Sequence, residues 1–145
     1  MSPVSEKIEQ HFLGKEHLPQ RNTTFSQQLW RGIRINLRNL TKEILLTIPI
    51  LLIGFIPVIG IFSTVLLFLI QSYYAGFGNM DYTLERHFNY KDSIIFVSKH
   101  KGLAVGNGIV FMLLLLIPLI GFILVLPLSV VSATKITINE LHSKI

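Results

Sequence analysis

Two long apolar stretches dominate the chain, at about residues 44–78 and 103–134. Half of the 145 residues are hydrophobic and only 14% are charged, so a water-soluble fold of this size lacks the polar surface to cover both stretches. Apolar runs of this length are typical of segments that lie in a lipid bilayer. The sequence therefore predicts an all-α membrane protein.

Each apolar stretch is interrupted near its middle by the same short pattern. Residues 56–60 read Ile-Pro-Val-Ile-Gly, and residues 117–121 read Ile-Pro-Leu-Ile-Gly. Proline removes a backbone donor and disfavours helix at the residue before it, while glycine permits a turn. We also expect interruptions at Pro49, Gly54 and Pro127.

The length of the arms beside these breaks favours helical hairpins. Each arm holds about 12 to 18 residues, roughly 18 to 27 Å of helix, whereas the hydrocarbon core is about 30 Å thick. Seven basic residues precede the first stretch, four lie between the stretches and two follow the second, and basic segments are typically cytoplasmic. Hairpins that enter part-way and turn back keep all three on one side. The alternative is one kinked span per stretch.

We therefore divide the chain into five parts. They are a polar N-terminal segment, a first membrane hairpin, a cytoplasmic connecting segment, a second membrane hairpin and a polar tail, at residues 1–43, 44–78, 79–102, 103–134 and 135–145.

An amphipathic helix is expected at about residues 28–43. Apolar residues such as Trp30 and Leu37 recur on one face, and Ile35 alone breaks the separation. The other face is basic and contains Arg31, Arg34, Arg38 and Lys42. This pattern is typical of a helix in the membrane interface. Two alternatives are packing against the protein with solvated arginines, and attraction of an anionic substrate to the membrane surface.

The breaks also suggest where transport chemistry could lie. A helix that begins inside the bilayer presents free N–H groups and a positive dipole end, which favour anions. Paired interrupted segments are typical of transport sites, although plain kinks have the same sequence. We name the residues of this hypothetical anion pathway: Pro57, Gly60, Pro118 and Gly121. A turn at that depth must be covered, so we expect a homo-oligomer, with Gly102, Gly106 and Gly108 permitting close helix contact.

The remaining sequence excludes several classes of function. The chain has no cysteine, which excludes disulfides and thiol chemistry, and the scattered histidines predict no metal site. No nucleophile with an oriented base is present, so we expect no enzyme and no cofactor. We assign the net charge of +5 to lipid head groups rather than nucleic acid. Asp81 is expected to cap a short helix, with Glu85 and Arg86 in local ion pairs, and the alternative is a gating role for all three residues.

Four blocks together resemble the CysZ sulfate-permease and etoposide-induced protein family. They are residues 55–60, the segment with Asp81, Tyr82, Glu85 and Arg86, residues 117–121 and residues 126–134. The resemblance implies an oligomeric α-helical protein of the bacterial inner membrane with partially inserted hairpins, associated with sulfate uptake. It also implies that the chain corresponds to the C-terminal portion of the family, without its first two long transmembrane helices.

The leading hypothesis is transport of an inorganic anion such as sulfate across the inner membrane. One alternative is a non-transporting membrane scaffold, which the eukaryotic branch of the family suggests. Another is an inactive fragment of a longer family member. The lipid bilayer is a partner in all three, and no nucleic acid is expected in any of them.

Overall fold

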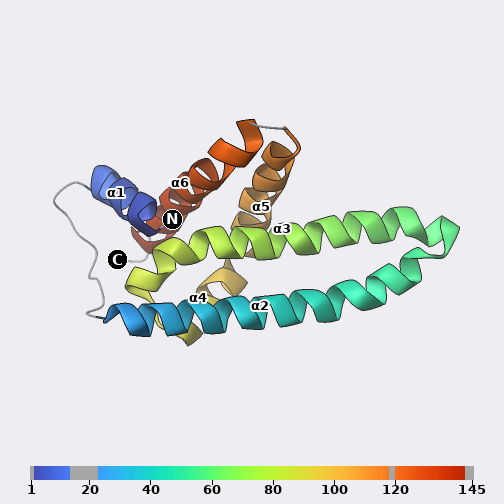
Figure 1. Cartoon of the computed structure of the whole chain (residues 1–145), viewed down its shortest axis with the longest axis horizontal. Coiled ribbons are helices and arrows are strands. Elements are labelled where there is room, and N and C mark those ends of the chain that lie inside the picture. Colours follow the sequence, from blue (N-terminus) through green and yellow to red (C-terminus); the bar gives the residue numbers. More distant parts are fainter. Residues whose placement is uncertain (1, 14–22, 118–119, 143–145) are drawn as a thin grey trace.

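The computed structural model describes residues 2–13, 23–117 and 120–142, and the regular structure in these ranges is entirely helical. The helices are α1 (Ser2–Leu13), α2 (Phe25–Gly54), α3 (Pro57–His87), α4 (Tyr90–Lys99), α5 (Lys101–Leu115) and α6 (Ile120–His142). The predicted all-α fold class is confirmed. Figure 1 shows two helical hairpins, α2–α3 and α5–α6, that point in different directions.

The first hairpin turns at Phe55 and Ile56, between α2 and α3. Pro57 is the first residue of α3, where its missing N–H would have no helical partner. Gly60 lies close to the end of α2, because a Cβ atom added there would be 2.9 Å from the carbonyl oxygen of Gly54. The two helices then run side by side along the whole hairpin (Figure 1).

The second hairpin repeats this arrangement between α5 and α6. A Cβ atom added at Gly121 would lie 2.3 Å from the carbonyl oxygen of Leu114, so only glycine permits this approach. Leu116 and Ile117 close the end of α5 with backbone hydrogen bonds to Leu113 and Leu114. The predicted turn residue Pro118 lies outside the described residues.

Several predicted boundaries fall inside helices. Helix α2 continues through Pro49, and α6 continues through Pro127, so the expected interruptions there are wrong. Helix α2 is unbroken across the 43/44 boundary, and α3 is unbroken across the 78/79 boundary.

Helix α3 is the centre of the fold and contacts the five other helices. Its apolar residues form a core with residues of α2, α4, α5 and α6, and its polar residues contact α1, α2, α5 and α6. The core comprises Ile35, Phe77, Met80, Leu84, Phe96, Val97, Ala104 and Ala133. Helices α1 and α4 lie together with the adjoining ends of α2, α3, α5 and α6. We call this region the polar end.

The hairpin turns are apolar and exposed. Phe55 is 78% exposed at the first turn and Leu116 is 75% exposed at the second. Among the described residues, two helical segments are long and apolar enough to cross a membrane, Ile59–His87 and Ile123–Leu141. Surfaces of this kind are stable only against lipid or another apolar partner. The apolar ends of the hairpins and the family assignment below support a membrane location.

Candidate functional site

The predicted basic face of α2 is divided by the fold. Arg34 and Lys42 are exposed and Arg38 is half-buried, whereas Arg31 is only 9% exposed. Trp30 lies on the outer surface with 68% of its area exposed. Arg31 therefore departs from the interfacial face, because it lies one turn before Ile35 on the side of α2 that faces the core.

Arg31 forms a buried ion pair with Asp81 of α3. The Nη2 and Nη1 atoms of Arg31 donate to the two carboxylate oxygens of Asp81 at 2.9 and 3.3 Å, and Nη2 also donates to Ser93 of α4. Two parallel bonds of this kind are strong and directional. The expectation that Asp81 caps a short helix is wrong, because Asp81 lies inside α3 and joins it to α2.

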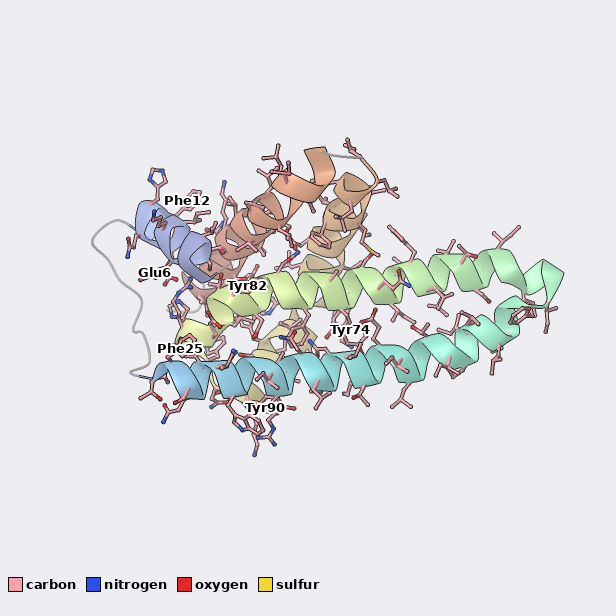
Figure 2. All side chains as sticks on the ribbon, in the orientation of Figure 1. Glu6, Phe12, Phe25, Tyr74, Tyr82 and Tyr90 are labelled. Atoms are coloured by element: carbon pink, nitrogen blue, oxygen red, sulfur yellow. The ribbon has the colours of Figure 1, made fainter. Side chains whose placement is uncertain are left out.

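A pocket of about 350 Å³, lined by several residues that carry polar groups, opens beside this ion pair. It is lined by Thr23, Gln27, Gln28, Trp30, Arg31, Arg34, Glu85, Asn89 and Tyr90. The guanidinium of Arg34 lies 4.4 Å from the centre of the Tyr90 ring, and Figure 2 shows Tyr90 beside α2. The pocket combines arginine and amide donors with one carboxylate, so it suits a polar ligand at the boundary between protein and water.

A second buried ion cluster joins α1 to α3. Arg86 Nε and Nη2 donate to one carboxylate oxygen of Glu9 at 2.9 and 2.6 Å, and His87 Nε2 lies 2.7 Å from the other oxygen. The side chain of Glu9 is only 3% exposed. Burial raises the pKa of Glu9, but the hydrogen bonds and positive charges of His87 and Arg86 together lower it by more than burial raises it. The pKa of Glu9 is therefore below its ordinary value.

Three buried hydroxyl groups continue this cluster between α1, α3 and α6. The oxygens of Ser5, Thr83 and Thr134 lie 2.9 to 3.0 Å from one another, and we call them the hydroxyl triangle. Arg86 Nη2 also donates to Ser5 at 2.8 Å. The hydroxyl triangle and the ion cluster therefore form one connected network of buried polar groups, joined by the hydrogen bond from Arg86 to Ser5.

Helices α3 and α5 approach each other unusually closely. A Cβ atom added at Gly108 would lie 1.7 Å from the carbonyl oxygen of Ser72, and one at Gly76 would meet Ala104. Asn79 donates to Asn107 at 2.9 Å beside this crossing. Of the predicted small residues only Gly108 is at the contact, whereas Gly102 and Gly106 have open space around them.

The two hairpin turns do not meet in one site. A pocket of about 320 Å³ at the first turn includes Gly54, Gly60, Ser63 and Thr64, and Thr64 donates to the carbonyl of Gly60. Its lining contains no charged side chain. The charged groups lie instead at the polar end, away from Pro57 and Gly60 (Figures 1 and 2).

Sequence reasoning missed Glu9, His87 and the hydroxyl triangle. A signal for part of this network was present, because Ser72, Asn79, Thr83 and Arg86 follow one another at intervals of seven, four and three residues, which places them along one face of α3. Polar residues at that spacing within an apolar helix indicate a polar contact with other helices. No group of side chains suited to a metal ion occurs among the residues that the structure describes.

Comparison with protein families gives a match to sulfate transporter CysZ/Etoposide-induced protein 2.4 over residues 1–126. The chain belongs to this family. The suspected resemblance is therefore confirmed, and the matched residues of this CysZ-family chain include α1, both hairpin turns and both buried ion pairs. The block from Pro127 to Thr134 lies beyond the match. No curated protein matches the chain.

Proposed function

We propose that this protein is a non-enzymatic membrane component of sulfate transport in a bacterial inner membrane. The observation that carries the proposal is the family match together with the separation of the molecule into apolar hairpin turns and a polar end. Arg34 lines the pocket at the polar end and is exposed, so it offers the positive charge that an anion needs. The bilayer and an inorganic anion such as sulfate are the partners that this arrangement suits.

The exposed apolar surface supports partial insertion of the hairpins. On α3 the exposed large apolar side chains end at Leu69, which is about 18 Å of helix from Pro57. On α6 they end at Leu128, about 12 Å of helix from Ile120. Both lengths are shorter than a hydrocarbon core of about 30 Å, so each hairpin enters the bilayer and turns back within it.

The outer face of α2 supports an assembly of several copies. Its exposed apolar side chains continue from Phe25 to Ile53, almost the full length of the helix and well past the depth that the α3 surface indicates. Lipid covers the part near the turn. A second copy of the chain covers the remainder in this proposal, because an apolar face of that length is unfavourable in water.

Sulfate uptake tests the proposal. Proteoliposomes with the wild-type chain are expected to take up labelled sulfate saturably, and uptake should be lost when Pro57, Gly60, Pro118 and Gly121 are all replaced by leucine. A variant with Gly102→Leu serves as control, because Gly102 has open space around it. Carbonate extraction verifies insertion of each protein. Insertion without uptake by the wild type would favour a scaffold or a chain that needs further helices.

A further inference from the structure

The Glu9 carboxylate occupies a site with the donors that an oxyanion needs. Arg86 supplies two N–H groups to one oxygen, at 2.9 and 2.6 Å, and His87 approaches the other oxygen at 2.7 Å. The side chains of Arg86 and His87 are only 8% and 4% exposed. Arg86 and His87 both belong to α3, whereas the carboxylate is on α1, a separate helix.

Hydroxyl groups of α3 and α6 complete the surroundings of this carboxylate. Thr83 and Thr134 are fully buried and contact Ser5 of α1 at 2.9 and 3.0 Å. Thr137 lies on the same face of α6 as Thr134, and its Oγ1 is buried with no hydrogen-bond partner among the described residues. If α1 moved away, Thr83 and Thr134 would lose their contact with Ser5, and Arg86 would lose its contacts with Ser5 and Glu9.

Helix α1 is attached mainly by these polar contacts. Ser5 and Glu9 are its only fully buried side chains among those described, and Val4 and Ile8 are half-buried. Phe12 is 49% exposed. An isolated helix of 12 residues is marginal in water, and little apolar area holds this one. A ligand that displaces the Glu9 carboxylate would therefore remove most of the contacts that hold α1 in place.

We propose that α3 and α6 form a binding site for a tetrahedral oxyanion, that Glu9 fills this site from within the chain, and that sulfate competes with Glu9 for it. The site residues are Arg86, His87, Thr83 and Thr134. A buried guanidinium without a counter-ion is strongly unfavourable, so release of α1 and binding of an anion are coupled. The choice of sulfate rests on the proposed function, and the site itself rests on the contacts above.

Isothermal titration of sulfate into the full chain in neutral detergent tests this competition. Glu9→Gln keeps the shape of the side chain but removes its charge, and it should raise the affinity for sulfate at least tenfold. Glu6→Gln is the matched control on the exposed side of the same helix and should bind as the wild type does. Equal affinity for the two variants would overturn the proposal. Parallel titrations with inorganic phosphate and a short-chain phosphatidylglycerol distinguish a free oxyanion from a lipid head group.

A reversible lock on α1 provides a second test. The chain has no cysteine, and the oxygens of Ser5 and Thr134 are 3.0 Å apart, so Ser5→Cys with Thr134→Cys places two thiols in contact. The oxidised pair should bind no sulfate, and reduction should restore sulfate binding. Oxidised Ser5→Cys alone is the control. Undiminished binding by the locked chain would contradict the proposal.

The outcomes separate this inference from the proposed function. Sulfate uptake that the oxidised lock leaves unchanged would overturn the site while transport stands. Tighter binding by Glu9→Gln without uptake in any variant would support the site and overturn transport by this chain.

Discussion

Gly76 of α3 packs directly on the backbone of Ala104 in α5. A Cβ atom added at Gly76 would lie 1.8 Å from the Ala104 carbonyl oxygen, a distance that no relaxed structure permits. The same crossing places Gly108 of α5 against Ser72 of α3. Reciprocal glycine contacts bring the two backbones together, and the two hairpins are joined there.

Replacing Gly76 by alanine should therefore destabilise the fold by about 1–3 kcal/mol, the usual cost of overpacking. Gly78→Ala is the matched control on the same helix, because a Cβ atom there meets open space. The control should be neutral or stabilising by up to about 1 kcal/mol, since alanine is the better helix former. Denaturation in a graded mixture of mild detergent and SDS measures both. Equal destabilisation by the two variants would rule out the close crossing.

The Arg31–Asp81 pair predicts a characteristic pattern in a double-mutant cycle. Asp81→Asn should cost about 3–5 kcal/mol, because it leaves the Arg31 guanidinium buried without its counter-ion. Arg31→Met combined with Asp81→Asn should cost less than Asp81→Asn alone, because the buried guanidinium is then absent. The same denaturation experiment measures the cycle. Additive effects of the two substitutions would mean that the two side chains do not interact.

The turn glycines should hold each hairpin closed. Gly121→Ala should have a larger effect than Gly60→Ala, because the added Cβ atoms would lie 2.3 and 2.9 Å from a backbone oxygen, respectively. Spin labels at Leu113 and Leu124 report the separation of α5 and α6, and their distance distribution should broaden in Gly121→Ala. Gly106→Ala, with open space at its Cβ, should leave the distribution unchanged. A broadened distribution in that control would refute this explanation.

Docking of α1 should be lost in acid. Burial raises the pKa of Glu9, and His87 and Arg86 together lower it by a larger amount, so that it lies below its ordinary value of 4.5. A lowered pKa means that the docked form binds fewer protons, so its stabilisation is complete above about pH 4.5 and falls as the pH decreases through the lower value. The protection of the α1 amides against hydrogen exchange, taken relative to their intrinsic exchange rate at each pH, should fall over that range. Glu6→Gln should behave as the wild type, and Glu9→Gln should show no such step.

The hairpins could be predicted from the sequence because their cause is local. Proline and glycine act on the backbone at their own positions, and the repeat at Pro57–Gly60 and Pro118–Gly121 marks both breaks in the chain. Pro49 and Pro127 show the limit of that reasoning. They have the same chemistry but no glycine three residues later, and the helices continue through them.

The polar end could not be predicted in the same way, because its contacts join distant parts of the chain. Arg31 and Asp81 are 50 residues apart, and Glu9 and Arg86 are 77 residues apart. Spacing along one helix indicates which residues share a face, but it does not indicate which helix that face meets. Gly108 was predicted as a contact residue on this basis, whereas its neighbours across the crossing, Ser72 and Gly76, were not.

The most direct test of how the molecule sits in the bilayer uses single cysteines in the cysteine-free chain. Phe55 and Leu116 mark the two hairpin turns, and Lys91 on α4 is an exposed residue at the polar end. In vesicles of known orientation, a cysteine at Lys91 should react with a membrane-impermeant thiol reagent from one side. Cysteines at Phe55 and Leu116 should react from neither side, because the proposed partial insertion places both turns within the bilayer. Reaction of a turn cysteine from the side opposite Lys91 would contradict partial insertion and show that the hairpin crosses the membrane.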